Sequence, residues 1–128
     1  MKYLLDTHAL LWWVHEPQKL SKIALEAIRN PDNDIAVSAV SAMEIATKHR
    51  KGRLEYRSPL AGDFLGQITL EGFIPLAVTC AHAQHAGAYP AALADPWDRL
   101  LAAQAELEGF ELLSCDEKIV TLGATTVW

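Results

Sequence analysis

Acidic residues stand at junctions between apolar runs and helix-like segments at four distant places in the sequence. Asp6 directly follows one apolar run, and Asp116 directly follows the end of another. Glu44 and Asp98 lie near the beginnings of two segments with helical patterning. Carboxylates held close together repel one another, and a hard divalent cation such as Mg²⁺ or Mn²⁺ removes that cost. A cation held in this way can activate a water molecule and clamp a phosphodiester, so the acids predict metal-dependent phosphoryl hydrolysis.

The acids can act together only if the fold brings them to one place, and the pattern of the chain favours such a fold. Short apolar runs alternate with longer helix-like segments, which predicts an α/β domain with a mostly parallel sheet. The expected strands are residues 2–5, 35–37, 73–78, 111–114 and 125–127, with Pro75 placing the third near a sheet edge or strand start. The expected helices are residues 7–15, 21–30, 41–51, 59–71, 80–89, 96–108 and 116–122. Segments that follow parallel strands gather at the carboxyl edge of the sheet, so we expect the acids to converge there.

Helix capping gives several of these acids a second interpretation. Ser41 and Glu44 match the S-x-x-E capping box. Asp95 is expected to cap the helix that follows it, with Asp98 in the first turn, where carboxylates favour the helix dipole. Asp116 is placed to cap the helix after it. A non-catalytic binding module with acids as caps is therefore the alternative to an enzyme, although capping and metal binding are compatible.

Asp6 is the acid that capping explains least, because a charged side chain directly after a buried strand needs a partner. Other chemistries on a similar sheet also use an acid here. A haloacid-type phosphatase would require Asp-x-Asp after the first strand, where this chain has Asp6, Thr7 and His8. A receiver domain would require an acidic pair there and a lysine near the last strand, which reads TTVW. Both patterns fit this sequence badly.

Length and composition restrict the class of protein. The chain has 128 residues, which is the size of one domain spanning residues 1–128. Two cysteines are too few for a disulfide framework and indicate a reducing compartment. No apolar stretch approaches the roughly 18 residues of a membrane span, so we expect a cytoplasmic protein without membrane contact.

The charge distribution leaves one place for contact with nucleic acid. The formal net charge of −5 gives no general attraction to a polyanion. A local basic cluster contains Lys48, Arg50, Lys51 and Arg53, which are candidates for binding the RNA backbone. The alternative is a solvated helix end, where cations favour the helix dipole.

Four segments in order along the chain resemble the PIN-domain proteins of the VapC toxin type. These segments are residues 4–12 (LLDTHALLW), the Ser38-x-x-Ser41-x-x-Glu44 block, residues 95–105 (DPWDRLLAAQA) and residues 114–116 (SCD). The resemblance implies a three-layer α/β/α fold around a central parallel five-stranded sheet. It also implies an Mg²⁺- or Mn²⁺-dependent endoribonuclease that is the toxin of a toxin–antitoxin pair. Its partners would be an RNA substrate, a cognate antitoxin protein and a second copy of the chain.

The resemblance also carries residue roles onto this sequence. Asp6, Glu44, Asp98 and Asp116 match the catalytic, metal-binding acids of the family. Thr7 and Ser114 match hydroxyl positions near the metal, where they would orient a ligand or water.

The sequence departs from the family pattern just before the third block. Ala92, Leu93 and Ala94 stand where many relatives carry His and Arg, so basic RNA contacts at that rim are in doubt.

Trp12 and Trp13 are adjacent and therefore point in different directions on a helix. One of these tryptophans is expected in the core, and the other is a candidate for lining a groove for an antitoxin helix. For His8 we expect packing against its own helix, and the alternative is a position at the border of the acidic site, because it closely follows Asp6.

Overall fold

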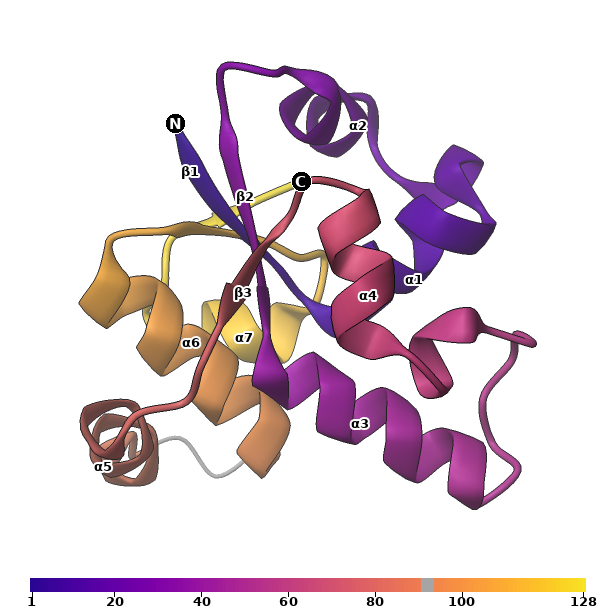
Figure 1. Ribbon diagram of the computed structural model, residues 1–128. Coiled ribbons are helices and arrows are strands. Elements are labelled where there is room, and N and C mark those ends of the chain that lie inside the picture. The colour runs from indigo at the N-terminus through magenta and orange to yellow at the C-terminus, as the bar shows by residue number, and fades with distance from the viewer. Residues whose placement is uncertain (91–93) are drawn as a thin grey trace.

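The computed structural model describes residues 1–90 and 94–128 (Figure 1). Ala92 and Leu93, where the family pattern is broken, lie outside the described residues. The strands are β1 (Lys2–Leu5), β2 (Asp34–Ser38), β3 (Ile74–Leu76), β4 (Glu111–Leu113) and β5 (Thr126–Val127). The helices are α1 (Thr7–His15), α2 (Lys22–Arg29), α3 (Ala39–Arg50), α4 (Phe64–Leu70), α5 (Cys80–Ala88), α6 (Pro96–Glu108) and α7 (Glu117–Val120), with 3₁₀ turns at Pro17–Lys19 and Pro59–Ala61.

The strands of the described residues form a five-stranded sheet in the order β3-β2-β1-β4-β5, and every pair in it is parallel. Pro75 lies in β3 at one edge, where its missing N–H costs no ladder hydrogen bond, as the sequence predicted. The chain moves from β1 to β2 and β3 on one side and to β4 and β5 on the other. The reversal at β1 and β4 opens a crevice beyond their carboxyl ends, which is where open α/β sheets bind ligands.

Alternation along the buried strands separates two hydrophobic cores, one on each face of the sheet. Leu5 and Val37 pack in the core that α1, α2 and α4 cover. Leu4, Ala36 and Leu112 pack on the opposite face against α6 and α7. Figure 1 shows α5 beside α6, and α3 extending away from the end of the sheet. The result is the three-layer α/β/α architecture that the family resemblance implied.

Two expected helices differ from the structure by more than one residue at their beginnings. The expected helix over residues 59–71 is instead a 3₁₀ turn followed by α4, because Asp63 caps a new helix by accepting a hydrogen bond from Gly66 N–H. The expected helix over residues 41–51 begins earlier, at Ala39, because Ser38 at the end of β2 caps it through Val40 N–H. The capping box that the sequence suggested for Ser41 and Glu44 is therefore wrong.

No helix in the described parts of the chain is long and apolar enough to cross a membrane.

Candidate active site

Asp6 joins the end of β1 to the beginning of α1. Its side chain caps α1, with Oδ1 accepting a hydrogen bond of 2.7 Å from Ala9 N–H. Its own N–H donates to the carbonyl of Leu113 at 3.1 Å, which continues the ladder toward β4. The side chain is only 5 % exposed. The sequence did not predict this capping role, which satisfies one carboxylate oxygen of an otherwise buried charge.

Asp116 lies in the loop after β4, beside Asp6 at the reversal of the sheet. Its Oδ1 caps α7 by accepting from Lys118 N–H at 2.9 Å, so the capping role that the sequence suggested is confirmed. Its N–H donates to Ser114 Oγ at 3.0 Å. The buried Ser114 hydroxyl is also hydrogen-bonded to the Asp6 carboxylate, so one serine links the two acids.

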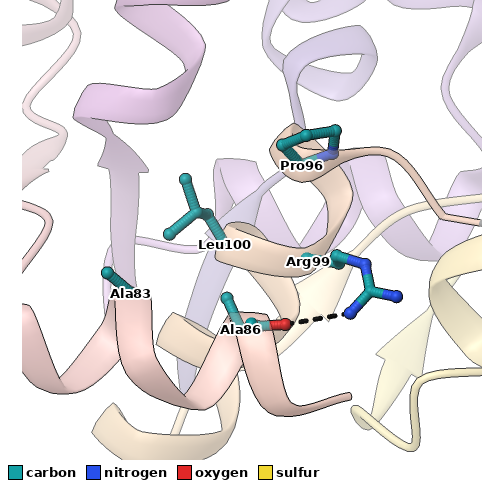
Figure 2. Close-up of a pocket in the computed structure, with 6 residues that line it drawn as sticks. Ala83, Ala86, Pro96, Arg99 and Leu100 are labelled. Atoms are coloured by element: carbon teal, nitrogen blue, oxygen red, sulfur yellow. Dashed lines mark hydrogen bonds between the residues drawn. The ribbon is translucent and has the colours of Figure 1, made fainter. Parts of the chain in front are cut away.

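The N-terminus of α6 supplies the third acidic position. Asp95 caps this helix by accepting from Asp98 N–H at 2.9 Å, as the Asp-Pro sequence predicted. The guanidinium of Arg99 donates to the carbonyls of Ala86 at 3.1 Å and Tyr89 at 2.7 Å, near the end of α5. Figure 2 shows Arg99 reaching Ala86 in this way. The start of α6 is therefore tied to the end of α5, which helps to position the side chain of Asp98.

Glu44 projects from α3 and is held by both of its carboxylate oxygens. The Thr7 hydroxyl donates to Oε1 at 2.9 Å, and the Lys48 ammonium lies 2.7 Å from Oε2. The Thr7 hydroxyl is also 2.9 Å from the Oγ of Ser41, which is fully buried. Because the Thr7 hydroxyl donates its single proton to Glu44, Ser41 must be the donor in the hydrogen bond between Ser41 and Thr7. Ser41, Thr7 and Glu44 thus form a directed relay that orients the carboxylate.

All four predicted acids line one cavity of about 130 Å³ beyond the carboxyl ends of β1 and β4. Its wall contains Asp6, Thr7, His8, Glu44, Lys48, Asp95, Asp98, Leu101, Asp116 and Lys118. The sequence patterns did not place Ser41 or Lys118 at the site, and they placed His8 at its border only as the alternative to helix packing. Lys48 could have been placed there from its i+4 spacing from Glu44, which puts both side chains on one face of a helix. The ring of His8 contacts Trp12 one turn further along α1, as expected, and its exposed side chain also lines this cavity.

The acids affect one another electrostatically. Burial, followed by the negative charges of Asp95 and Asp116, raises the pKa of Asp98 to about 7, and Glu44 adds to this effect. Burial also raises the pKa of Asp6, against the lowering effect of its hydrogen bonds from Ser114 and Ala9 N–H. Mutually raised pKa values are typical of carboxylates that share a site without a compensating cation.

The donor set fits a hard divalent cation. Carboxylate and hydroxyl oxygens predominate on the cavity wall, and these are the donors that Mg²⁺ and Mn²⁺ prefer. Among residues 1–90 and 94–128, no three His, Cys, Asp or Glu side chains are already close enough to hold a metal ion. Lys48 keeps one oxygen of Glu44 occupied. A cation in the cavity would offset the repulsion between these carboxylates.

A larger cavity of about 450 Å³ lies between α5 and α6 and has a different character (Figure 2). Its lining consists of Ala83, Ala86, Gly87, Pro96, Arg99 and Leu100. The guanidinium of Arg99 is engaged with backbone carbonyls. This lining offers no carboxylate to a cation, so the smaller acidic cavity is the candidate active site.

Only two of the four basic residues of the predicted RNA-binding cluster line a cavity. Lys48 lines the acidic cavity and also the one beside it. Arg53 lines a neighbouring cavity, whereas Arg50 and Lys51 are exposed at the end of α3 and line neither cavity. Cations at that helix end also favour the helix dipole, so the structural interpretation of Arg50 and Lys51 stays open beside the RNA-binding one.

A parallel α/β/α domain with clustered acids at its sheet reversal defines a class of protein that acts on phosphate esters with the help of divalent cations. The family model for the PIN domain matches residues 3–124. The chain belongs to the PIN domain family, a family of metal-dependent nucleases.

Individual relatives agree with this membership. Ribonuclease VapC22 of Mycobacterium tuberculosis is 35% identical over 117 residues, covering 91% of this chain and 88% of the relative. The structure of VapBC2 from Rickettsia felis bound to a DNA fragment from their promoter matches with a TM-score of 0.70 at 16% identity, over 100% of this chain and 98% of that one. A toxin–antitoxin complex from Klebsiella pneumoniae matches with a TM-score of 0.57 at 19% identity, over 89% and 86%. These two structural likenesses concern the fold.

Proposed function

We propose that this chain is a divalent-metal-dependent endoribonuclease and the toxin of a toxin–antitoxin pair. Asp6, Glu44, Asp98 and Asp116 would hold the cation, and Thr7 and Ser114 would orient the ligands. The observation that carries the proposal is the convergence of these acids, from four separate segments, on one cavity, where burial and the charges of Asp95, Asp116 and Glu44 raise the pKa of Asp98 to about 7. The 35% identity to a ribonuclease supports RNA as the substrate.

A divalent cation, when bound, would supply the Lewis acidity that activates water and neutralises the scissile phosphate. The chain's own residues prepare the site for it. Ala9 N–H and the Ser114 hydroxyl fix the direction of the Asp6 carboxylate. Thr7 and Lys48 fix the two oxygens of Glu44. With its pKa raised to about 7, Asp98 stays fully ionised at neutral pH only when positive charge lies near it, so an incoming cation would favour its ionised form.

Cleavage of total RNA with and without EDTA tests the proposal. We expect cleavage with Mg²⁺ or Mn²⁺, none with EDTA, and none by Asp6→Asn, since asparagine keeps the cap of α1 but loses the charge. Asp63→Asn is the matched control because Asp63 caps α4 and does not line the acidic cavity. Full cleavage by a folded, contaminant-free Asp6→Asn protein would refute the assignment.

The same proposal includes the identity of the cation, an antitoxin protein as partner and a homodimer. The oxygen-rich wall supports Mg²⁺ or Mn²⁺. The structural neighbour from Klebsiella pneumoniae is a toxin–antitoxin complex, which supports an antitoxin protein as a partner of this chain. The location proposed for both is the cytoplasm. The homodimer stays a prediction, which analytical ultracentrifugation of the purified chain tests.

A non-catalytic PIN-like module whose acids serve as helix caps is the second candidate. One specific observation favours it, because Asp6, Asp95 and Asp116 each cap a helix with Oδ1. Glu44 argues against it, since Ser38 rather than Glu44 or Ser41 caps α3. A side chain that caps nothing, yet is held toward the other acids by Thr7 and Lys48, is better explained by a role in the cavity.

A further inference from the structure

A second cavity, of about 140 Å³, adjoins the acidic one. Its lining consists of His8, Leu11, Trp12, Lys48, Arg53, Leu54, Glu55 and Tyr56. His8 and Lys48 line both cavities and therefore form the wall between them. A molecule held by its phosphate at the acidic cavity has its neighbouring atoms at the entrance of this second one.

The wall of the second cavity is aromatic. The rings of His8 and Trp12 lie 5.7 Å apart at an interplanar angle of 39°, with His8 exposed and Trp12 partly exposed. Tyr56 is fixed from two sides, because its hydroxyl donates to Glu16 and its ring stacks on His15 at 4.6 Å. Trp12 has a further ring contact with Trp128 at 5.7 Å. These contacts hold the rings in place before any ligand arrives, which reduces the entropy cost of binding one.

The charges of this wall select among ligands. Arg53 is exposed and supplies positive charge at the rim, whereas the Lys48 ammonium is committed to Glu44. Glu55 also lines the cavity and disfavours a phosphate group inside it. A flat, neutral ring fits this combination better than an anion does. Unpaired nucleobases of single-stranded RNA are such rings, and proteins hold them by stacking on aromatic side chains.

We propose that this second cavity, with His8 and Trp12 as its stacking surface and Arg53 at its rim, binds an unstacked nucleobase next to the scissile phosphate. This inference rests on the proposed ribonuclease function and adds a recognition site to it. His8, at the shared wall, contacts the base on the side that faces the cleaved bond. Arg53 contacts the backbone phosphate on the outer side.

The test is the affinity of a labelled single-stranded RNA oligomer, measured by fluorescence anisotropy with Mg²⁺ in an Asp98→Asn background that does not cleave. The same oligomer is prepared with an abasic site at each position in turn. One abasic position should weaken binding by about tenfold, because stacking of one base on an aromatic side chain contributes on this order. His8→Ala and Trp12→Leu should each remove that difference between intact and abasic RNA. Arg53→Ala should weaken both RNAs equally.

Controls distinguish failure of the base-binding proposal from failure of the proposed ribonuclease function and from misfolding of a variant. His8 is exposed, so His8→Ala is expected to fold even if Trp12→Leu does not. His85→Ala is the matched histidine control, because His85 lies on α5 and lines neither cavity. An abasic penalty that survives in His8→Ala and Trp12→Leu overturns the base site, even if the wild type cleaves RNA. Unchanged RNA binding together with lost capture of an antitoxin peptide would reassign the cavity to a protein partner. RNA that neither binds nor is cleaved overturns both proposals.

Discussion

The ammonium group of Lys48 lies 2.7 Å from Oε2 of Glu44, so one acid of the cavity is already compensated by a cation that belongs to the chain. The two residues are spaced i, i+4 on α3, in the favourable order with the acid nearer the N-terminus. The Glu44 side chain is only 13 % exposed, so this pair is better shielded from salt than a surface pair. A divalent cation must enter a cavity in which the Lys48 ammonium already pairs with one of the acids.

Removal of that charge should make divalent cations bind more tightly. Lys48→Gln lacks the ammonium that repels an incoming cation and frees one oxygen of Glu44. Isothermal titration calorimetry with Mn²⁺ should therefore give a lower Kd than for the wild type. Lys51→Gln is the matched control, since Lys51 is exposed and lines neither cavity. Weaker Mn²⁺ binding by Lys48→Gln would mean that Lys48 positions Glu44 more than it repels the ion.

The stability of the metal-free protein should fall as the pH rises toward neutrality. The pKa of Asp98 is raised to about 7, so the folded protein binds this proton more tightly than the unfolded chain does. The resulting stabilisation is fully present below about pH 4, the unfolded pKa, and is lost as the pH rises through about 7. In EDTA, the Tm should be lower at pH 8 than at pH 5.

Asp98→Asn should reduce the fall of Tm between pH 5 and pH 8 and should raise Tm at pH 8, because the amide cannot ionise. Some slope should remain, since burial raises the pKa of Asp6 in the same direction. The same variant should lose RNA cleavage by more than ~100-fold, the upper range for groups that merely support a metal ligand. An unchanged pH dependence would show that Asp98 is not the group that titrates.

Mn²⁺ should raise Tm, because a ligand that binds only the folded state stabilises it by about 2.7 kcal/mol at 100 times its Kd. Differential scanning fluorimetry over a Mn²⁺ series measures the shift. Asp116→Asn should abolish the shift while it keeps the cap of α7, and Asp63→Asn, which alters a cap outside the cavity, should retain it. A protein whose acids only cap helices would show no shift at all.

Ser41 should matter for the site although it does not line the cavity. Ser41→Ala removes the hydrogen bond that fixes the Thr7 hydroxyl, and Glu44 loses part of its orientation. Loss of such a supporting bond is expected to weaken metal affinity or cleavage by about 10-fold to 100-fold. Thr7→Ser keeps the donor and should be nearly wild type, whereas Thr7→Val should resemble or exceed Ser41→Ala. Equal Mn²⁺ affinity in wild type, Ser41→Ala and Thr7→Val would remove the relay from the proposal.

Local sequence patterns predicted much of the fold. The helix Pro96–Glu108 has the expected bounds, with Asp95 as its cap and Gly109 in the left-handed conformation at φ 72° after its last residue. The expected strand over residues 2–5 also matches β1. These signals act within about four residues, so they do not depend on tertiary contacts. The third strand was predicted too long, because a short edge strand has few partners that define its ends.

The convergence of the acids on one edge followed from the sequence only through a general rule about parallel sheets. The sequence by itself determined which acids follow strands or open helices, and thus which carboxylates were candidates. Tertiary structure decided that Ser41 is a donor to Thr7 rather than a cap, because that bond joins residues 34 positions apart. It also decided that His8 faces two cavities and that Ser114 links Asp6 to Asp116. Capping is a local hydrogen bond, whereas these contacts exist only after the sheet brings β1, β4 and α3 together.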